Sequence, residues 1–198
     1  MYFFYILGSS ELARISCANH KVNLCIRSAL EKHKPINSNI RTLNAYVARI
    51  KRTIELNKVF ANAKCRLRLE NSTRWGSTFL MLKRLKKAYK NGLFDSLEPA
   101  NKLPVSIDVI NSYLKILKPA YLVNIYLHRN SSSIAEVIPP VLKLINNWEI
   151  LLRQDNVSKS CKIFCKYLID EFKRRFNYEL ESELFQVYFH FIFIFKLI

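Results

Sequence analysis

Apolar residues recur at helical spacing along most of the chain. Between Cys17 and Lys32 they fall at positions i, i+3, i+4, i+7 and i+8, which places them on one face of a helix. The residues on this face are Val22, Cys25, Ile26, Ala29 and Leu30. Pro35 follows the pattern, and we expect it to end the helix because proline lacks a backbone N–H.

A second helix is expected from the Asn37–Asn39 cap to about Asn62. Its apolar stripe is formed by Leu43, Val47, Ile50 and Ile54. The next segment, Cys65–Leu69, alternates apolar and basic residues with a period of two, which is typical of a short strand. The aromatic and branched residues of Met1–Leu7 favour another strand.

A third helix is expected to begin at Ser77 or Thr78, and Gly92 provides its stop. Its apolar face would be formed by Phe79, Leu82, Leu85 and Tyr89. The rest of its surface is strongly basic, with Lys83, Arg84, Lys86, Lys87 and Lys90. The pattern therefore indicates an amphipathic helix with a cationic outer side.

Three more helices are expected after the connection marked by Pro99 and Pro104. The first begins at Ser106 and ends at Pro119. The second opens with the capping-box spacing Ser133–Glu136, kinks at Pro139–Pro140 and continues to Leu152. The third runs from Ser160 to Phe176 and buries Phe164, Leu168, Phe172 and Phe176.

The charge of the chain is uneven. The net charge is +17 over 198 residues, and residues 1–94 contribute +15 of it, with 19 Lys and Arg against four Glu and no Asp. Residues 95–198 contribute only +2. A basic half joined to a near-neutral half favours a polyanion partner for the first and a packing or partner surface for the second. A basic surface that is merely solvated is the alternative.

An Arg74-Trp75 pair stands directly before the basic helix. A large aromatic face beside a guanidinium is suited to stacking on an unpaired base and binding a phosphate. Trp75 is equally suited to packing in the core, and Arg74 to pairing with a structural carboxylate. Behind them, Lys83, Arg84, Lys86 and Lys87 form a candidate DNA-backbone or nuclear-import patch.

Two short motifs carry a resemblance to a known family. Ser16–Leu24 has the form of a Cys-x-x-His…Asn-Leu box, and Thr73–Thr78 has the form of a Thr-Arg-Trp-x-Ser-Thr box. Together, about fifty residues apart, they resemble transposases of the hAT superfamily and host proteins derived from them. The resemblance covers most of residues 11–180. It implies a mostly α fold, with residues 1–94 as a remnant of an RNase H-like α/β core and residues 95–198 as part of an all-helical insertion lobe.

The resemblance also implies roles for single residues. Trp75 would stack on a base turned out of the duplex, and His20 would lie near the catalytic edge, against a phosphate or a loop. The family cuts DNA with two aspartates and a glutamate that hold divalent metal ions, and both aspartates precede the Cys-x-x-His box. Here the first Asp is Asp95, and only Glu11 precedes Cys17. We therefore expect no catalytic residues, no cofactor and no transposase activity.

The cysteines and histidines do not predict a metal site. Cys17 and His20 have the spacing of half a zinc site, with Cys25 and His33 nearby, but the second ligand pair is poor. Five cysteines, an odd number without a dense regular spacing, favour reduced thiols in the nucleus or cytosol. We expect Cys161 and Cys165, one helical turn apart, to be core residues.

The apolar tail Leu184–Ile198 is the strongest candidate for a membrane segment. It is shorter than the ~20 residues that a span requires, and it carries Gln186, His190 and Lys196. A buried strand or helix is favoured, so no membrane association is predicted.

These observations lead to one functional hypothesis and two alternatives. The first is a non-catalytic, transposase-derived fragment that is nuclear and binds nucleic acid, DNA above all, with low specificity. A different class of function is a helical interaction module, whose neutral half binds a transposase-like protein or another host partner. The third is a functionless remnant of a dead transposable element.

Overall fold

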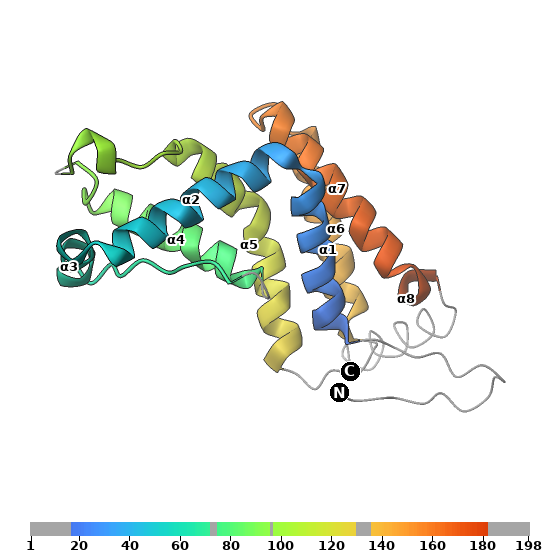
Figure 1. The fold of residues 1–198 in the computed structure, drawn as a ribbon. Coiled ribbons are helices and arrows are strands. Elements are labelled where there is room, and N and C mark those ends of the chain that lie inside the picture. The colour runs from blue at the N-terminus through green and yellow to red at the C-terminus, as the bar shows by residue number, and fades with distance from the viewer. Residues whose placement is uncertain (1–16, 72–74, 96, 130–135, 182–198) are drawn as a thin grey trace, which may run out of the picture.

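The computed structural model describes residues 17–71, 75–95, 97–129 and 136–181. All elements assigned in these ranges are helices (Figure 1): α1 (Ala18–Lys32), α2 (Lys34–Arg52), α3 (Ile54–Asn62), α4 (Gly76–Lys90), the short 3-10 helix η1 (Pro99–Asn101), α5 (Ile107–Arg129), α6 (Ile138–Arg153), α7 (Lys159–Arg175) and α8 (Asn177–Glu181). The expectation of a mostly helical chain is confirmed. No α/β core is present in the described ranges, and Met1–Leu7, Glu11 and Leu184–Ile198 lie outside them.

The helices pack into two groups that share α5. At one side α1 packs against α7, and α7 against α6; at the other α4 packs against α5, and α2 is followed by α3 (Figure 1). The long helix α5 contacts α1, α4, α6 and α7. One hydrophobic cluster runs from Val22 to Phe176 and includes residues on both sides of position 94, where the sequence suggested a domain boundary.

Helix α1 forms as predicted, with Val22, Cys25, Ile26, Ala29 and Leu30 buried. The first helix ends at Lys32, before Pro35, as predicted. The second helix begins earlier than the predicted Asn37–Asn39 cap, and Pro35 lies in its first turn, where a missing N–H costs no helical hydrogen bond. His33 caps α2, since its Nδ1 accepts a hydrogen bond from the backbone N–H of Ile36 at 3.2 Å.

The predicted helix from Asn37 to Asn62 is two helices that meet at Thr53. Thr53 has an extended backbone (φ −84°, ψ 113°), and its hydroxyl donates to the carbonyl of Arg49 at 3.2 Å. A β-branched residue whose hydroxyl donates to a nearby backbone carbonyl offers the chain an alternative to a continued helix. Because of this break, Ile54 leaves the apolar stripe and is 64% exposed, which corrects the prediction that it is buried.

The predicted strand at Cys65–Leu69 was also wrong, although the alternation is present from Cys65 to Arg68; Leu69 breaks it, because its side chain is 40% exposed. Residues 65–70 belong to no helix or strand. Cys65 and Leu67 are buried, whereas Arg66 and Arg68 are exposed. The segment therefore has the side-chain pattern of a strand without a neighbouring strand, because it lies on helices instead of a sheet.

Helix α4 ends at a glycine as predicted. Gly92 has a positive φ of 69°; its N–H donates to the carbonyl of Tyr89 at 2.9 Å, and the N–H of Leu93 donates to that of Ala88 at 3.2 Å. This is the Schellman pattern that favours glycine. Tyr89 was expected on the buried face but is 44% exposed, since it lies in the last turn of the helix.

Prolines act differently from the prediction in α5 and α6. Pro119 lies inside α5, which continues for ten residues to Arg129 instead of ending there. In the turn before it, the carbonyl of Ile116 accepts a hydrogen bond from Trp148 Nε1 at 3.0 Å, so packing supports the interrupted helix. Pro139 and Pro140 lie at the start of α6 and not at a kink within it, and residues 130–135 lie outside the described residues. Helix α7 and its buried phenylalanines match the prediction.

Candidate nucleic-acid interface

The ion pairs of the described residues are concentrated in α1, α6, α7 and α8. They are Lys21–Glu179, Arg27–Glu31, Lys32–Glu171, Lys173–Glu149, Arg174–Glu171 and Arg175–Glu171. Two of them join α1 to later helices: Lys32 pairs with Glu171 in α7, and Lys21 pairs with Glu179 in α8. At this side of the molecule, cations thus take part in holding helices together.

Glu171 is the centre of this network. Its carboxylate is 2% exposed and accepts from Lys32 Nζ at 2.6 Å, from Arg174 at 2.8 Å and from Arg175 at 3.2 Å. Burial alone raises the pKa of Glu171, but the hydrogen bonds and charges of Lys32 and Arg174 outweigh it and lower the pKa to about 2. Glu171 therefore stays ionised and links α1 to α7.

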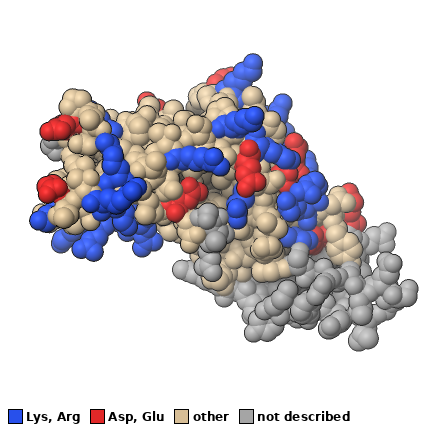
Figure 2. Space-filling view, viewed as in Figure 1, with Lys and Arg blue, Asp and Glu red and all other residues tan. Residues whose placement is uncertain are grey.

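The stretch between Lys34 and Lys90 is different, because it contains 15 Lys and Arg residues and only Glu55 and Glu70, a net charge of +13. Glu70 is engaged locally, since its carboxylate accepts from the Thr78 hydroxyl at 2.6 Å. None of the described cations of this stretch forms an ion pair with a described carboxylate. Figure 2 shows Lys and Arg side chains gathered over the end that carries α3.

Helix α4 presents part of its predicted basic patch to solvent. Lys83 and Lys87 are exposed, whereas Arg84 and Lys86 are half-buried. The opposite face of α4 enters the core with Phe79, Leu82 and Leu85. The amphipathic division predicted from the sequence is therefore present.

Further exposed cations lie on α2, α3 and the segment after α3, and the sequence interpretation did not include them in the site. They are Lys51, Arg52, Lys58, Lys64, Arg66 and Arg68. Arg66 and Arg68 project from a backbone that the buried Cys65 and Leu67 hold against the core. For Arg66 and Arg68, the period-two alternation was the signal that could have identified them, since it separates the two arginines from the buried Cys65 and Leu67.

Trp75 is buried, with 2% of its surface exposed. Its backbone N–H donates to Asn23 Oδ1 at 3.2 Å, and its ring meets Tyr121 edge-on, with centroids 6.3 Å apart. The two sequence boxes therefore contact each other. A stacking role requires an open ring face, and here the indole has none, which favours the packing interpretation of Trp75. Arg74 lies outside the described residues.

His20 and Cys17 are exposed at the start of α1. His33 caps α2 at the other end of this 15-residue helix, about 20 Å away. Cys25 is buried, and burial raises the pKa of its thiol to about 12. Within the described ranges, no three His, Cys, Asp or Glu side chains converge as metal ligands.

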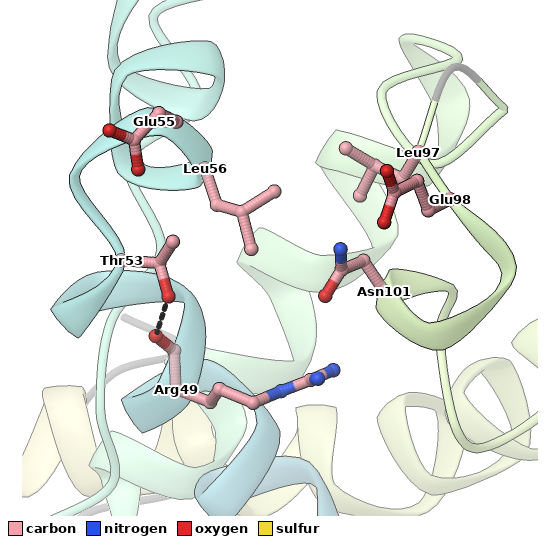
Figure 3. A pocket seen from close by; sticks show the side chains of 7 residues that line it. All are labelled: Arg49, Thr53, Glu55, Leu56, Leu97, Glu98 and Asn101. Carbon is pink, nitrogen blue, oxygen red and sulfur yellow. Dashed lines mark hydrogen bonds between the residues drawn. The ribbon is translucent and has the colours of Figure 1, made fainter.

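A cavity of about 390 Å³ lies between the α2–α3 junction and η1 (Figure 3). Arg49 donates to the carbonyl of Ala100 at 2.8 Å, and the Tyr46 hydroxyl donates to that of Asn101 at 2.6 Å. Glu55 and Glu98 line opposite sides of the opening. These contacts fasten η1 to α2, and the lining does not bring a nucleophile and a base together.

Among the described helices, none combines the length and the apolar character required to cross a bilayer.

Comparison with known families places part of the chain. Residues 15–108 match the model described as the ZBED1 RNase-like helical domain, and ZBED1 is derived from a hAT transposase. No curated protein matches the chain. The matched residues include α1 to α4 and the start of α5, and thus both sequence boxes and the whole basic stretch from Lys34 to Lys90. The match supports a transposase-derived helical domain related to the hAT superfamily.

Proposed function

We propose that this transposase-derived helical chain is a non-catalytic nucleic-acid-binding protein that contacts the DNA backbone with low sequence specificity. The observation that carries the proposal is the charge of +13 between Lys34 and Lys90, together with the lack of ion pairs between the described cations of this stretch and the described carboxylates. The contacting set, called here the α2–α4 basic surface, consists of exposed side chains: Lys51, Arg52, Lys58, Lys64, Arg66, Arg68, Lys83, Lys87 and Lys90.

The chemistry of this surface suits phosphates. Lys and Arg without carboxylate partners release counterions from DNA when they neutralise its phosphates, and this supplies affinity that is independent of sequence. Arg66 and Arg68 suit such contacts in particular, because their backbone is anchored by buried neighbours. Contacts of this kind position a protein on DNA and do not read bases, so the proposal implies low specificity.

The absence of transposase chemistry and the nuclear location belong to the same proposal. The divalent metals of strand cleavage require converging carboxylates, and the chain has no Asp before Asp95. Lys83–Lys87 has the composition of a nuclear-import signal, and Lys83 and Lys87 are exposed on α4.

The test is the salt dependence of binding to a fluorescein-labelled duplex, measured by anisotropy with the full chain. Each phosphate contact contributes about 0.9 to the slope of log affinity against log salt. Combined reversal of Arg66, Arg68, Lys83 and Lys87 to Glu should reduce this slope by up to about 3.6 and weaken binding at every salt concentration.

The matched control reverses four exposed cations elsewhere, namely Lys102, Arg153, Lys159 and Lys166. It changes the net charge by the same amount and should keep most of the wild-type slope. Equal losses in both variants would show that net charge alone attracts DNA, and this result would contradict a defined surface.

A further inference from the structure

Apart from the α2–α4 basic surface, helices α5 and α6 form an apolar groove of about 450 Å³. Leu122 and Tyr126 line it from α5, and Pro140 and Leu144 line it from α6. Lys118 and Lys143, one on each helix, also line it. None of these residues takes part in the proposed DNA contacts.

The groove contains large apolar side chains that are open to solvent. Leu122 is 55% exposed and Tyr126 is 40% exposed, one helical turn apart on the same side of α5. Pro140 at the start of α6 is short and rigid, so it lines the groove without filling it. Two apolar residues at i and i+4 beside a second helix make the kind of groove that receives the apolar face of an amphipathic helix.

The charges of the groove restrict what can occupy it. Lys118 and Lys143 are exposed, and neither forms an ion pair with a carboxylate of the described residues. An apolar groove whose lining includes two lysines without ion pairs among the described residues matches a helix with carboxylates along the edges of its apolar face. DNA phosphates could pair with the two lysines but would leave the apolar side chains of Leu122 and Tyr126 exposed to solvent.

A second copy of this chain fits less well, because two proteins of net charge +17 repel each other. We therefore propose that the α5–α6 groove docks an acidic amphipathic helix of a protein partner. Leu122 and Tyr126 would supply the apolar anchors, and Lys118 and Lys143 would fix the orientation of the partner helix through its carboxylates.

The probe is a labelled synthetic peptide with Leu at i, i+3, i+4 and i+7 and Glu at the flanking positions, titrated with the full chain. Its twin carries Lys in place of each Glu. The Glu peptide should bind at least tenfold more tightly than the twin. Leu122→Glu should weaken its binding at least tenfold, as expected for loss of an interface anchor. Ile150→Glu is the matched control on α6, 45% exposed and outside the groove, and should leave binding unchanged.

A charge exchange gives a second, independent result. The double variant Lys118→Glu and Lys143→Glu should reverse the preference and favour the Lys peptide. The variant in which Arg66, Arg68, Lys83 and Lys87 are reversed should still bind the Glu peptide with wild-type affinity, even at salt concentrations at which it no longer binds DNA. Each of the two proposals, docking and DNA binding, can therefore be contradicted without the other.

Three results would overturn the proposal. In the first, Leu122→Glu and Ile150→Glu have equal effects. In the second, reversal of Arg66, Arg68, Lys83 and Lys87 abolishes binding of the Glu peptide, which would place the peptide on the basic surface. In the third, sedimentation equilibrium shows a dimer of the chain that Leu122→Glu dissociates, which would make a second copy the occupant.

Discussion

The α1–α7 side and the α2–α4 side of the molecule use the same basic residue types for different purposes. Around Glu171, three cations converge on one buried carboxylate. One of them, Lys32, joins α1 to α7, two helices that are far apart in the sequence. Between Lys34 and Lys90, cations outnumber carboxylates by 15 to two, and the described ones form no ion pairs with described carboxylates. The number of Lys and Arg residues therefore says little about a surface until their partners are known.

Aromatic rings pack on both sides of the molecule, since Phe172 also contacts Trp148 and Phe176, but the two sides differ in their ion pairs. The α2–α4 side is built on aromatic packing, with Phe60, Phe94 and Tyr46 in contact and Trp75 against Tyr121. Its cations are mostly exposed, where water and salt screen their mutual repulsion. At the α1–α7 side, part of the cohesion is electrostatic and depends on the ionisation of Glu171. The comparison can be tested through the following variants.

The largest effect is expected for Trp75→Ala. Removing a fully buried Trp costs about 3–5 kcal/mol of unfolding free energy, measured by urea denaturation. Trp75→Phe is the control and should cost clearly less, because it retains most of the apolar volume and Trp75 Nε1 has no hydrogen-bond partner among the described residues. Selective loss of hairpin-DNA binding with an unchanged melting temperature would instead support a base contact by Trp75.

Glu171→Gln should destabilise the α1–α7 side by about 2–3 kcal/mol. The cost stays moderate because Lys32 and Arg174 are more than half exposed and can be hydrated when their partner is lost. Glu31→Gln is the matched control; its pair with Arg27 is 4.0 Å long and exposed, so the expected change is below about 0.5 kcal/mol. Similar losses of unfolding free energy for the two variants would show that the buried carboxylate of Glu171 contributes no more than an exposed ion pair.

Lowering the pH should destabilise the α1–α7 side, because Glu171 becomes protonated. The pKa of Glu171 falls from 4.5 to about 2 on folding, so its contribution is complete above pH 4.5 and is lost as the pH falls towards 2. At pH 3 the loss should be about 2 kcal/mol. Urea titrations of the wild type and Glu171→Gln between pH 6 and pH 3 should therefore converge, and parallel curves would contradict this assignment.

The smallest effect on stability is expected for Arg66→Ala with Arg68→Ala. Both side chains are exposed and without ion pairs among the described residues, so the unfolding free energy should change by less than about 0.5 kcal/mol. The salt slope of DNA binding should nevertheless fall by about 1.8. A large loss of stability would show that these arginines are structural.

Much of the fold could be predicted from apolar periodicity alone. The stripes of α1, α4 and α7 were found because each has several apolar residues in a continuous helical pattern. Prolines and Thr53 were misjudged, because a proline is compatible with a helix start and, where packing compensates, with a helix interior. The Cys65–Leu67 alternation was assigned to a sheet because the pattern reports which side is buried and not what buries it.

The candidate site was predicted less completely. The basic helix α4 was recognised from its composition, but the partner of each cation depends on tertiary contacts such as Lys32 with Glu171, 139 residues apart. The α5–α6 groove had no local signal, because Leu122 and Tyr126 are ordinary members of a helical pattern until the neighbouring helix is placed.

The pairing of α1 with α7 also has a consequence for biosynthesis. Helix α1 leaves the ribosome early, but Val22, Cys25 and Ile26 lack their cover until Phe164 to Phe172 have been made about 140 residues later. At typical synthesis rates the interval is on the order of ten seconds, during which the nascent chain presents an apolar helix face. Transient shielding of this face by a chaperone would be useful in this interval. A chain truncated before α7 would keep the apolar face of α1 exposed and would therefore tend to aggregate.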